Sequence, residues 1–152
     1  MSDQVTAALP VDLLVVGIAN LMNLLLIGMF LARGFGRPRT GRTFGTGVVV
    51  LAVPLAAAAL WNAGTGRPWW TVALPAVMVA YCVVEFLLDY IYRVDFRHSR
   101  WLGPYLGLYY AGLIALIGYA FLVDNLLGYV TLVPYFAGLA ATWYSYAHAG
   151  HG

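Results

Sequence analysis

Glu85 and Asp89 are the residues whose chemistry most needs an explanation, because both carboxylates lie within a long apolar stretch. Residues four apart on a helix lie one above the other, so they are predicted to share a face with Tyr81 and Arg93. Asp89 is well placed for an ion pair with Arg93. A carboxylate as deep as Glu85 must pair, bind a cation or be protonated. This face could bind a headgroup, relay protons or simply join helices.

Further polar side chains are predicted to reach the interior of the same bundle. Asn20 and Asn23 lie three apart near the middle of the first apolar stretch, and their face is expected to hydrogen-bond another helix. Tyrosines early in the fourth apolar stretch and late in the fifth are predicted to lie near Glu85, although tyrosines also collect at membrane interfaces. The candidate ligand-binding or ion-binding residues are Glu85, Asp89, Tyr81, Asn20, Asn23, Tyr109 and Tyr144.

The elements that must position these residues are membrane-spanning helices. Of the 152 residues, 62% are hydrophobic and only 9% are charged, against the roughly 25% charged residues of soluble domains. We therefore expect an all-α integral membrane protein, a compact bundle of five transmembrane helices in a single domain, residues 1–152. A helix needs about 20 residues to cross a bilayer. The predicted spans are 11–32, 44–61, 69–93, 101–123 and 126–147.

The arginines predict the orientation of the bundle. Seven of the eight cations fall in two loops on one side: Arg33, Arg37, Arg39, Arg42, Arg93, Arg97 and Arg100. Arg67 stands alone on the other side. Because basic loops stay in the cytoplasm, the N-terminus is expected outside and the C-terminus in the cytoplasm. The sequence thus predicts a multi-pass protein of the cell (cytoplasmic, inner) membrane.

Two rows of small residues predict how the last two helices pack. Such rows let transmembrane helices approach closely, and the fourth and fifth spans are separated by a turn of only a few residues. An antiparallel hairpin that packs along these rows is therefore expected. The rows include Gly103, Gly107 and Ala111 in the fourth span and Ala137 and Ala141 in the fifth.

Nothing in the sequence indicates an enzyme, a haem or a metal site. The three histidines, His98, His148 and His151, fall in a loop or near the C-terminus, so no facing pair could hold a haem inside the bundle. No phosphate loop, nucleophile elbow or His-Glu-x-x-His motif occurs. Any cofactor is left unknown, no catalytic residue is assigned, and nucleic-acid binding is not expected from a net charge of +2.

Residues 133–142 resemble the last helix of the tryptophan-rich sensory or translocator protein family. That family carries a Pro-Trp motif ahead of its second span, whereas Pro68 and Trp69 stand ahead of the third span here. The chain is therefore not assigned to that family.

Two functions of different classes follow from these residues. The first is a membrane protein of binding or accessory type that holds an apolar ligand or a partner's helices, with a polar patch around Glu85 in the cytoplasmic half. The alternative is a small oligomeric transporter or channel that couples protonation of Glu85 to movement of its substrate. The expected partners are the lipid bilayer and other membrane subunits or further copies of the chain.

Overall fold

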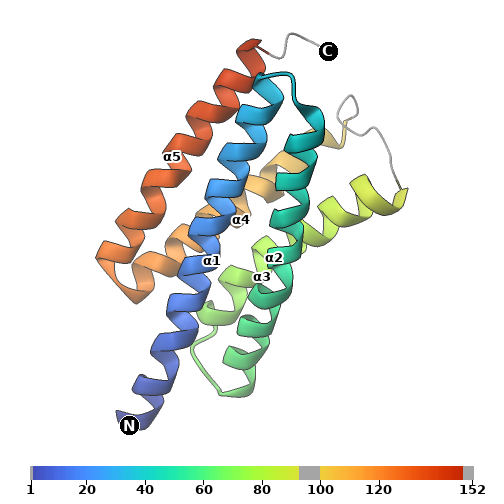
Figure 1. Ribbon diagram of the computed structural model, residues 1–152. Coiled ribbons are helices and arrows are strands. Elements are labelled where there is room, and N and C mark those ends of the chain that lie inside the picture. Colours follow the sequence, from blue (N-terminus) through green and yellow to red (C-terminus); the bar gives the residue numbers. More distant parts are fainter. Residues whose placement is uncertain (1, 93–99, 149–152) are drawn as a thin grey trace.

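The computed structural model describes residues 2–92 and 100–148, with side chains described from Leu9 onward. This part of the chain consists of helices joined by short turns, with no strand. The prediction of an all-helical chain is confirmed. Figure 1 shows the arrangement of its helices. They are α1 (Ser2–Gly34), α2 (Pro38–Gly64), α3 (Trp70–Phe86), the π-helix η1 (Leu87–Tyr92), α4 (Leu102–Val123) and α5 (Asn125–His148).

The prediction of five helices long and apolar enough to cross a membrane is also confirmed. The qualifying segments run from 22 to 27 residues, at or above the ~20 residues that a crossing helix needs. Many large apolar side chains are exposed on the outside of the bundle, among them Leu24, Val53, Leu60, Leu126 and Val133. Outward apolar groups of this kind suit a lipid environment.

The helices form a bundle in which chain neighbours also pack in space. α1 packs against α2 and α5, α3 packs against α2 and α4, and α4 packs against α5. The N-terminus lies at one end of the bundle and the C-terminus at the other (Figure 1). At the end with the C-terminus, α3 with η1 leans away from α1 and α5. The bundle is consequently more open there.

The core lies where α1 crosses the other helices. Its fully buried side chains include Met22, Leu55, Met78 and Leu116. Cys82, the single cysteine, is 1% exposed, and its thiol donates to the carbonyl oxygen of Val48 on α2 at 3.9 Å. Because lipid tails are as apolar as the core, such close packing and interhelical hydrogen bonding hold the helices together.

The predicted row of small residues on α4 does not pack against α5. Gly103, Gly107 and Ala111 are exposed, and a Cβ atom at either glycine would meet nothing within 4 Å. The close approach uses Gly112 instead, where a Cβ atom would lie 2.8 Å from the sulfur and 3.2 Å from the Cα of Met78. The four-residue repeat is present on α4, but the face of α4 that packs against α3 is the adjacent one, which carries Gly112.

The row on α5 meets α1. Ala141 and Ser145 are buried, whereas Ala137 is exposed. A Cβ atom at Gly34, in the last turn of α1, would lie 3.4 Å from the Cα of Ser145 and 2.9 Å from the Tyr144 ring. Small residues on both helices therefore allow the C-terminal ends of α1 and α5 to lie close together.

The sequence predicted one continuous helix over residues 69–93, but the third span is divided into two helical segments. α3 ends at Phe86, and the chain continues to Tyr92 as η1. A π-helix bonds i to i+5 and so takes more residues per turn than an α-helix. Tyr90 attaches η1 to α2, because its hydroxyl lies 2.6 Å from that of Thr46 and its ring lies under Arg42.

Candidate ligand-binding cavity

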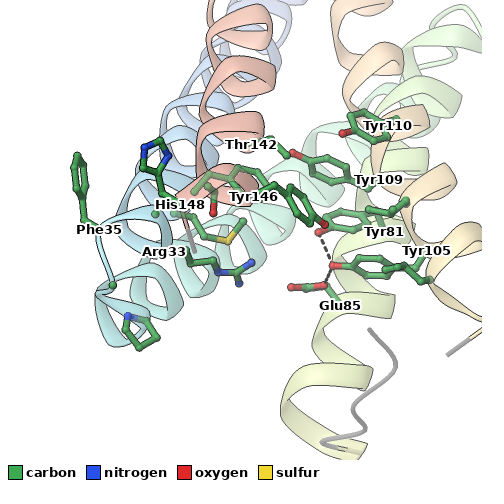
Figure 2. Close-up of a pocket in the computed structure, with 18 residues that line it drawn as sticks. Arg33, Phe35, Tyr81, Glu85, Tyr105, Tyr109, Tyr110, Thr142, Tyr146 and His148 are labelled. Atoms are coloured by element: carbon green, nitrogen blue, oxygen red, sulfur yellow. Dashed lines mark hydrogen bonds between the residues drawn. The ribbon is translucent and has the colours of Figure 1, made fainter. Parts of the chain in front are cut away.

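A cavity of about 1040 Å³ opens between the diverging helices (Figure 2). It lies between the C-terminal ends of α1 and α5 on one side and the end of α3 and the start of α4 on the other. Its polar lining residues are Arg33, Tyr81, Glu85, Tyr105, Tyr109, Tyr110, Thr142, Ser145, Tyr146 and His148. Apolar side chains that include Met29, Phe30 and Leu106 complete the lining. Aromatic and apolar walls with a few polar groups are typical of small-molecule sites.

Glu85 forms part of a hydrogen-bonded chain along one wall of this cavity. The Tyr105 hydroxyl donates to the Glu85 carboxylate, and the hydroxyls of Tyr81 and Tyr105 lie 3.0 Å apart. Two hydroxyl groups thus connect α3 and α4 to the carboxylate, as Figure 2 shows. Such a chain can orient a charged group and can pass a proton between its members.

Four tyrosines pack in a row that begins beside Glu85 (Figure 2), and we call them the tyrosine wall: Tyr81, Tyr105, Tyr109 and Tyr110. The ring centroid of Tyr81 lies 5.5 Å from that of Tyr105 and 5.2 Å from that of Tyr109. Tyr109 meets Tyr110 edge to face at 4.9 Å. These distances and tilted geometries are those of stabilising aromatic pairs. The wall is therefore a fixed surface.

Arg33 reaches the cavity from α1, and Gly41 of α2 makes room for it. A Cβ atom at position 41 would lie 3.1 Å from the Cγ and 3.7 Å from the Nε of Arg33. The side chain therefore crosses α2 where there is only backbone. Figure 2 shows it extended toward the wall that carries Glu85.

The structure brings together only part of the predicted site. Tyr81, Glu85 and Tyr109 line the cavity, whereas Asp89 and Tyr144 do not. Asp89 lies in η1, beyond the end of α3, and is not part of the cavity lining. Tyr144 packs against Phe35 and stacks on His148 at 4.1 Å, and both of these residues line the cavity.

The two asparagines of α1 lie away from the cavity. Asn20 donates to the Thr131 hydroxyl of α5 at 3.0 Å, as expected of an amide that bonds another helix. Asn23 is 5% exposed and lies within the bundle. Neither lines the cavity, so the structure gives both a place in helix packing.

Five of the seven predicted topology arginines are described, and they lie at the cavity end of the bundle: Arg33, Arg37, Arg39, Arg42 and Arg100. Arg93 and Arg97 lie outside the described residues, as do His98 and His151. The expected Asp89–Arg93 ion pair therefore stays a prediction. His148 ends α5 and lines the cavity.

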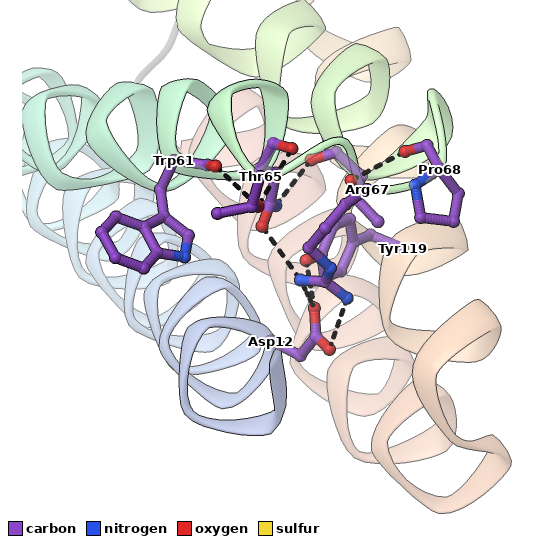
Figure 3. Close-up of polar contacts among 8 residues, drawn as sticks. Asp12, Trp61, Thr65, Arg67, Pro68 and Tyr119 are labelled. Carbon is purple, nitrogen blue, oxygen red and sulfur yellow. Dashed lines mark hydrogen bonds and ion pairs between the residues drawn. The ribbon is translucent and has the colours of Figure 1, made fainter. Parts of the chain in front are cut away.

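A second polar cluster, which the sequence did not predict, lies at the opposite end of the bundle (Figure 3). Arg67 donates through both terminal nitrogens to Asp12 of α1, with each distance 2.9 Å, and one of them also donates to Asn62 at 2.9 Å. The Tyr119 hydroxyl of α4 donates to Asp12 at 2.5 Å. Asn62 in turn donates to the carbonyl of Thr71 at 3.0 Å. We call these five residues the Asp12 cluster.

The Asp12 cluster joins α1, α2, the start of α3 and α4 in one network. Asp12 is 6% exposed, and Asn62, Thr71 and Tyr119 are fully buried. The hydrogen bond to Asp12 raises the pKa of Arg67 above its already high value, so Arg67 stays charged at any physiological pH. The signal in the sequence was Asp12 itself, a carboxylate inside the first apolar stretch. Arg67, between the second and third stretches, is the only arginine predicted on the same side of the membrane.

No protein-family model, curated protein or solved structure matches this chain. Among residues 2–92 and 100–148, no three His, Cys, Asp or Glu side chains gather so as to hold a metal ion.

Proposed function

We propose that the chain is a multi-pass protein of the cytoplasmic membrane, with its N-terminus outside. The proposal is supported by the gathering of Arg33, Arg37, Arg39, Arg42 and Arg100 at one end of the bundle, because arginine-rich ends stay in the cytoplasm. The cavity end is then the cytoplasmic end, and the Asp12 cluster faces outside.

Within that membrane we propose that the protein is of binding or accessory type and holds an amphipathic small molecule. The observation that carries this proposal is the cavity of about 1040 Å³ between α1, α3, α4 and α5. Pockets of ~300 to 1,000 Å³ hold drug-sized ligands. The tyrosine wall and Glu85 supply fixed polar groups on one side of the cavity. Met29, Phe30 and Leu106 supply apolar surface beside them, which is the combination that an amphipathic ligand needs.

Recovery of a bound molecule tests the proposal. The protein is purified in a mild neutral detergent, and small molecules extracted from it are analysed by mass spectrometry. Leu106→Trp places bulk in the cavity and is expected to reduce the recovered ligand. Leu122→Trp is the matched control, because Leu122 lies exposed on the same helix, away from the cavity. Equal recovery from both variants would contradict the proposal.

A proton-coupled transporter is the second candidate, and the hydrogen-bonded chain of Glu85, Tyr105 and Tyr81 favours it. Proton relays through membranes use chains of ionisable side chains such as Glu, and a tyrosine hydroxyl can both donate and accept within such a chain. In proteoliposomes, a transporter would show flux that depends on the pH gradient and disappears in Glu85→Gln. A binding protein would show no such flux in either form.

A further inference from the structure

The cavity carries opposite charges on facing walls, and this restricts the ligand. Glu85 comes from α3, and Arg33 comes from the last turn of α1. Figure 2 shows the Arg33 side chain extended toward the wall that carries Glu85 and Tyr105. A headgroup of a single charge would be repelled by one of the two walls. A headgroup that carries both a positive and a negative charge can be attracted by both walls.

The wall around Glu85 suits a positively charged group. The carboxylate is held in place by the Tyr105 hydroxyl. The Tyr81 and Tyr105 rings pack together beside it, and the rings of Tyr109 and Tyr110 continue the wall from there. Aromatic faces attract cations, and cages of aromatic side chains are a recognised means of binding quaternary ammonium groups.

The opposite wall suits a negatively charged oxygen group. The guanidinium of Arg33 presents a planar fork of donors that matches phosphate or carboxylate oxygens. Its stem lies across Gly41, so its approach to the cavity is set by the backbone of α2. Arg33 and Glu85 also have interaction partners within the chain, and a headgroup would share these contacts or exchange with them.

The position of the cavity suits a headgroup with an apolar chain. Arg33, Leu102 and His148 lie in the terminal turns of their helices, where a membrane-spanning helix meets the headgroup layer. Glu85 is seven residues before the end of η1 at Tyr92, or ~10 Å deeper. Met29, one turn deeper than Arg33, and Leu106 supply apolar surface beside the polar groups.

We infer that the cavity binds the headgroup of a zwitterionic amphiphile, with an ammonium group against Glu85 and the tyrosine wall and a phosphate group against Arg33. The inference rests on the proposed binding function and names its ligand class. The acyl chain would follow the apolar side of the cavity.

Binding of four single-chain amphiphiles with the same acyl chain tests the inference. Native mass spectrometry of the protein in neutral detergent counts the bound molecules for each headgroup. The headgroups are phosphocholine (zwitterionic), phosphoglycerol (anionic), trimethylammonium (cationic) and glycerol (neutral). The zwitterionic compound is expected to bind about tenfold more tightly than either singly charged compound and about a hundredfold more tightly than the neutral one, since each lost charge-assisted contact costs about a factor of ten.

Two variants should change the preference in opposite directions. Glu85→Gln removes the negative wall and should favour the anionic compound, whereas Arg33→Gln should favour the cationic compound. A misfolded protein would lose all binding and would not show these opposite shifts. Arg37→Gln and Asp124→Asn remove charges outside the cavity lining and should keep the zwitterionic preference.

The outcomes separate this inference from the proposed function. Equal binding of the neutral and zwitterionic compounds, or variants that leave the preference unchanged, would overturn the inference while the binding function stands. If free phosphocholine binds as tightly as the amphiphile, the assignment to an amphiphile is wrong. If none of the four compounds binds, the inference fails, and the binding function is then decided by the recovery of a bound molecule from the purified protein.

Discussion

Replacement of Arg67 by glutamine is expected to cause the largest loss of stability among single polar substitutions in the described chain. Arg67 makes three hydrogen bonds of 2.9 Å, two to Asp12 and one to Asn62. Glutamine can replace at most one of them. Asp12 is then left as a buried carboxylate with Tyr119 as its donor.

The size of the effect follows from the burial of the pair. Loss of one partner from a buried ion pair costs about 3 to 5 kcal/mol. The side chains of Arg67 and Asp12 are 16% and 9% exposed, so water reaches them to some extent. We therefore take the lower end of the range and expect Arg67→Gln to lower the free energy of unfolding by about 3 kcal/mol.

Reversible unfolding by SDS in mixed micelles, followed by circular dichroism, measures this change. Arg39→Gln is the matched control, because Arg39 is exposed at the start of α2, and it should lie within about 0.5 kcal/mol of wild type. The double variant with Asp12→Asn removes the uncompensated charge and should recover about half of the loss. Wild-type stability of Arg67→Gln, or strictly additive effects in the double variant, would refute the reasoning.

Three further predictions follow from packing and orientation. Gly112→Ala should lower the free energy of unfolding by about 1 to 3 kcal/mol, because its Cβ would collide with α3. Gly107→Ala is the control and should melt like wild type. Equal melting temperatures of the two variants would contradict this packing. Asn20→Leu should cost about 0.6 and at most ~1.7 kcal/mol in the same unfolding assay, the usual worth of an interhelical hydrogen bond in a membrane. A cysteine at Thr65 should react with an impermeant thiol reagent added to intact cells and a cysteine at Thr40 should not; the reverse pattern would invert the proposed orientation.

The helices could be predicted from the sequence because their signal is local. A stretch of ~20 apolar residues has few other ways to satisfy its backbone in a membrane. α1, α2 and α5 extend beyond the expected spans 11–32, 44–61 and 126–147. The π-helix at 87–92 was not predicted, because a change of hydrogen-bond register leaves no mark in hydrophobicity.

The contacts of the site were harder to predict, because they depend on which helices meet. The four-residue spacing placed Tyr81 and Glu85 on one face correctly, but it could not reveal Tyr105 as the donor to Glu85. The row of Gly103 and Gly107 was identified without knowledge of the direction it faces. Arg67 was counted for orientation, although its main contact is Asp12 on another helix.

The burial of Cys82 makes its thiol a reporter of movement between α3 and α2. Cys82 follows Tyr81 on α3, and its thiol bonds the α2 carbonyl of Val48. A thiol reagent can reach it only when α3 parts from α2, so the rate of its modification measures that movement in the unmodified chain. A ligand that holds the walls in place would slow the reaction, and one that spreads them would accelerate it.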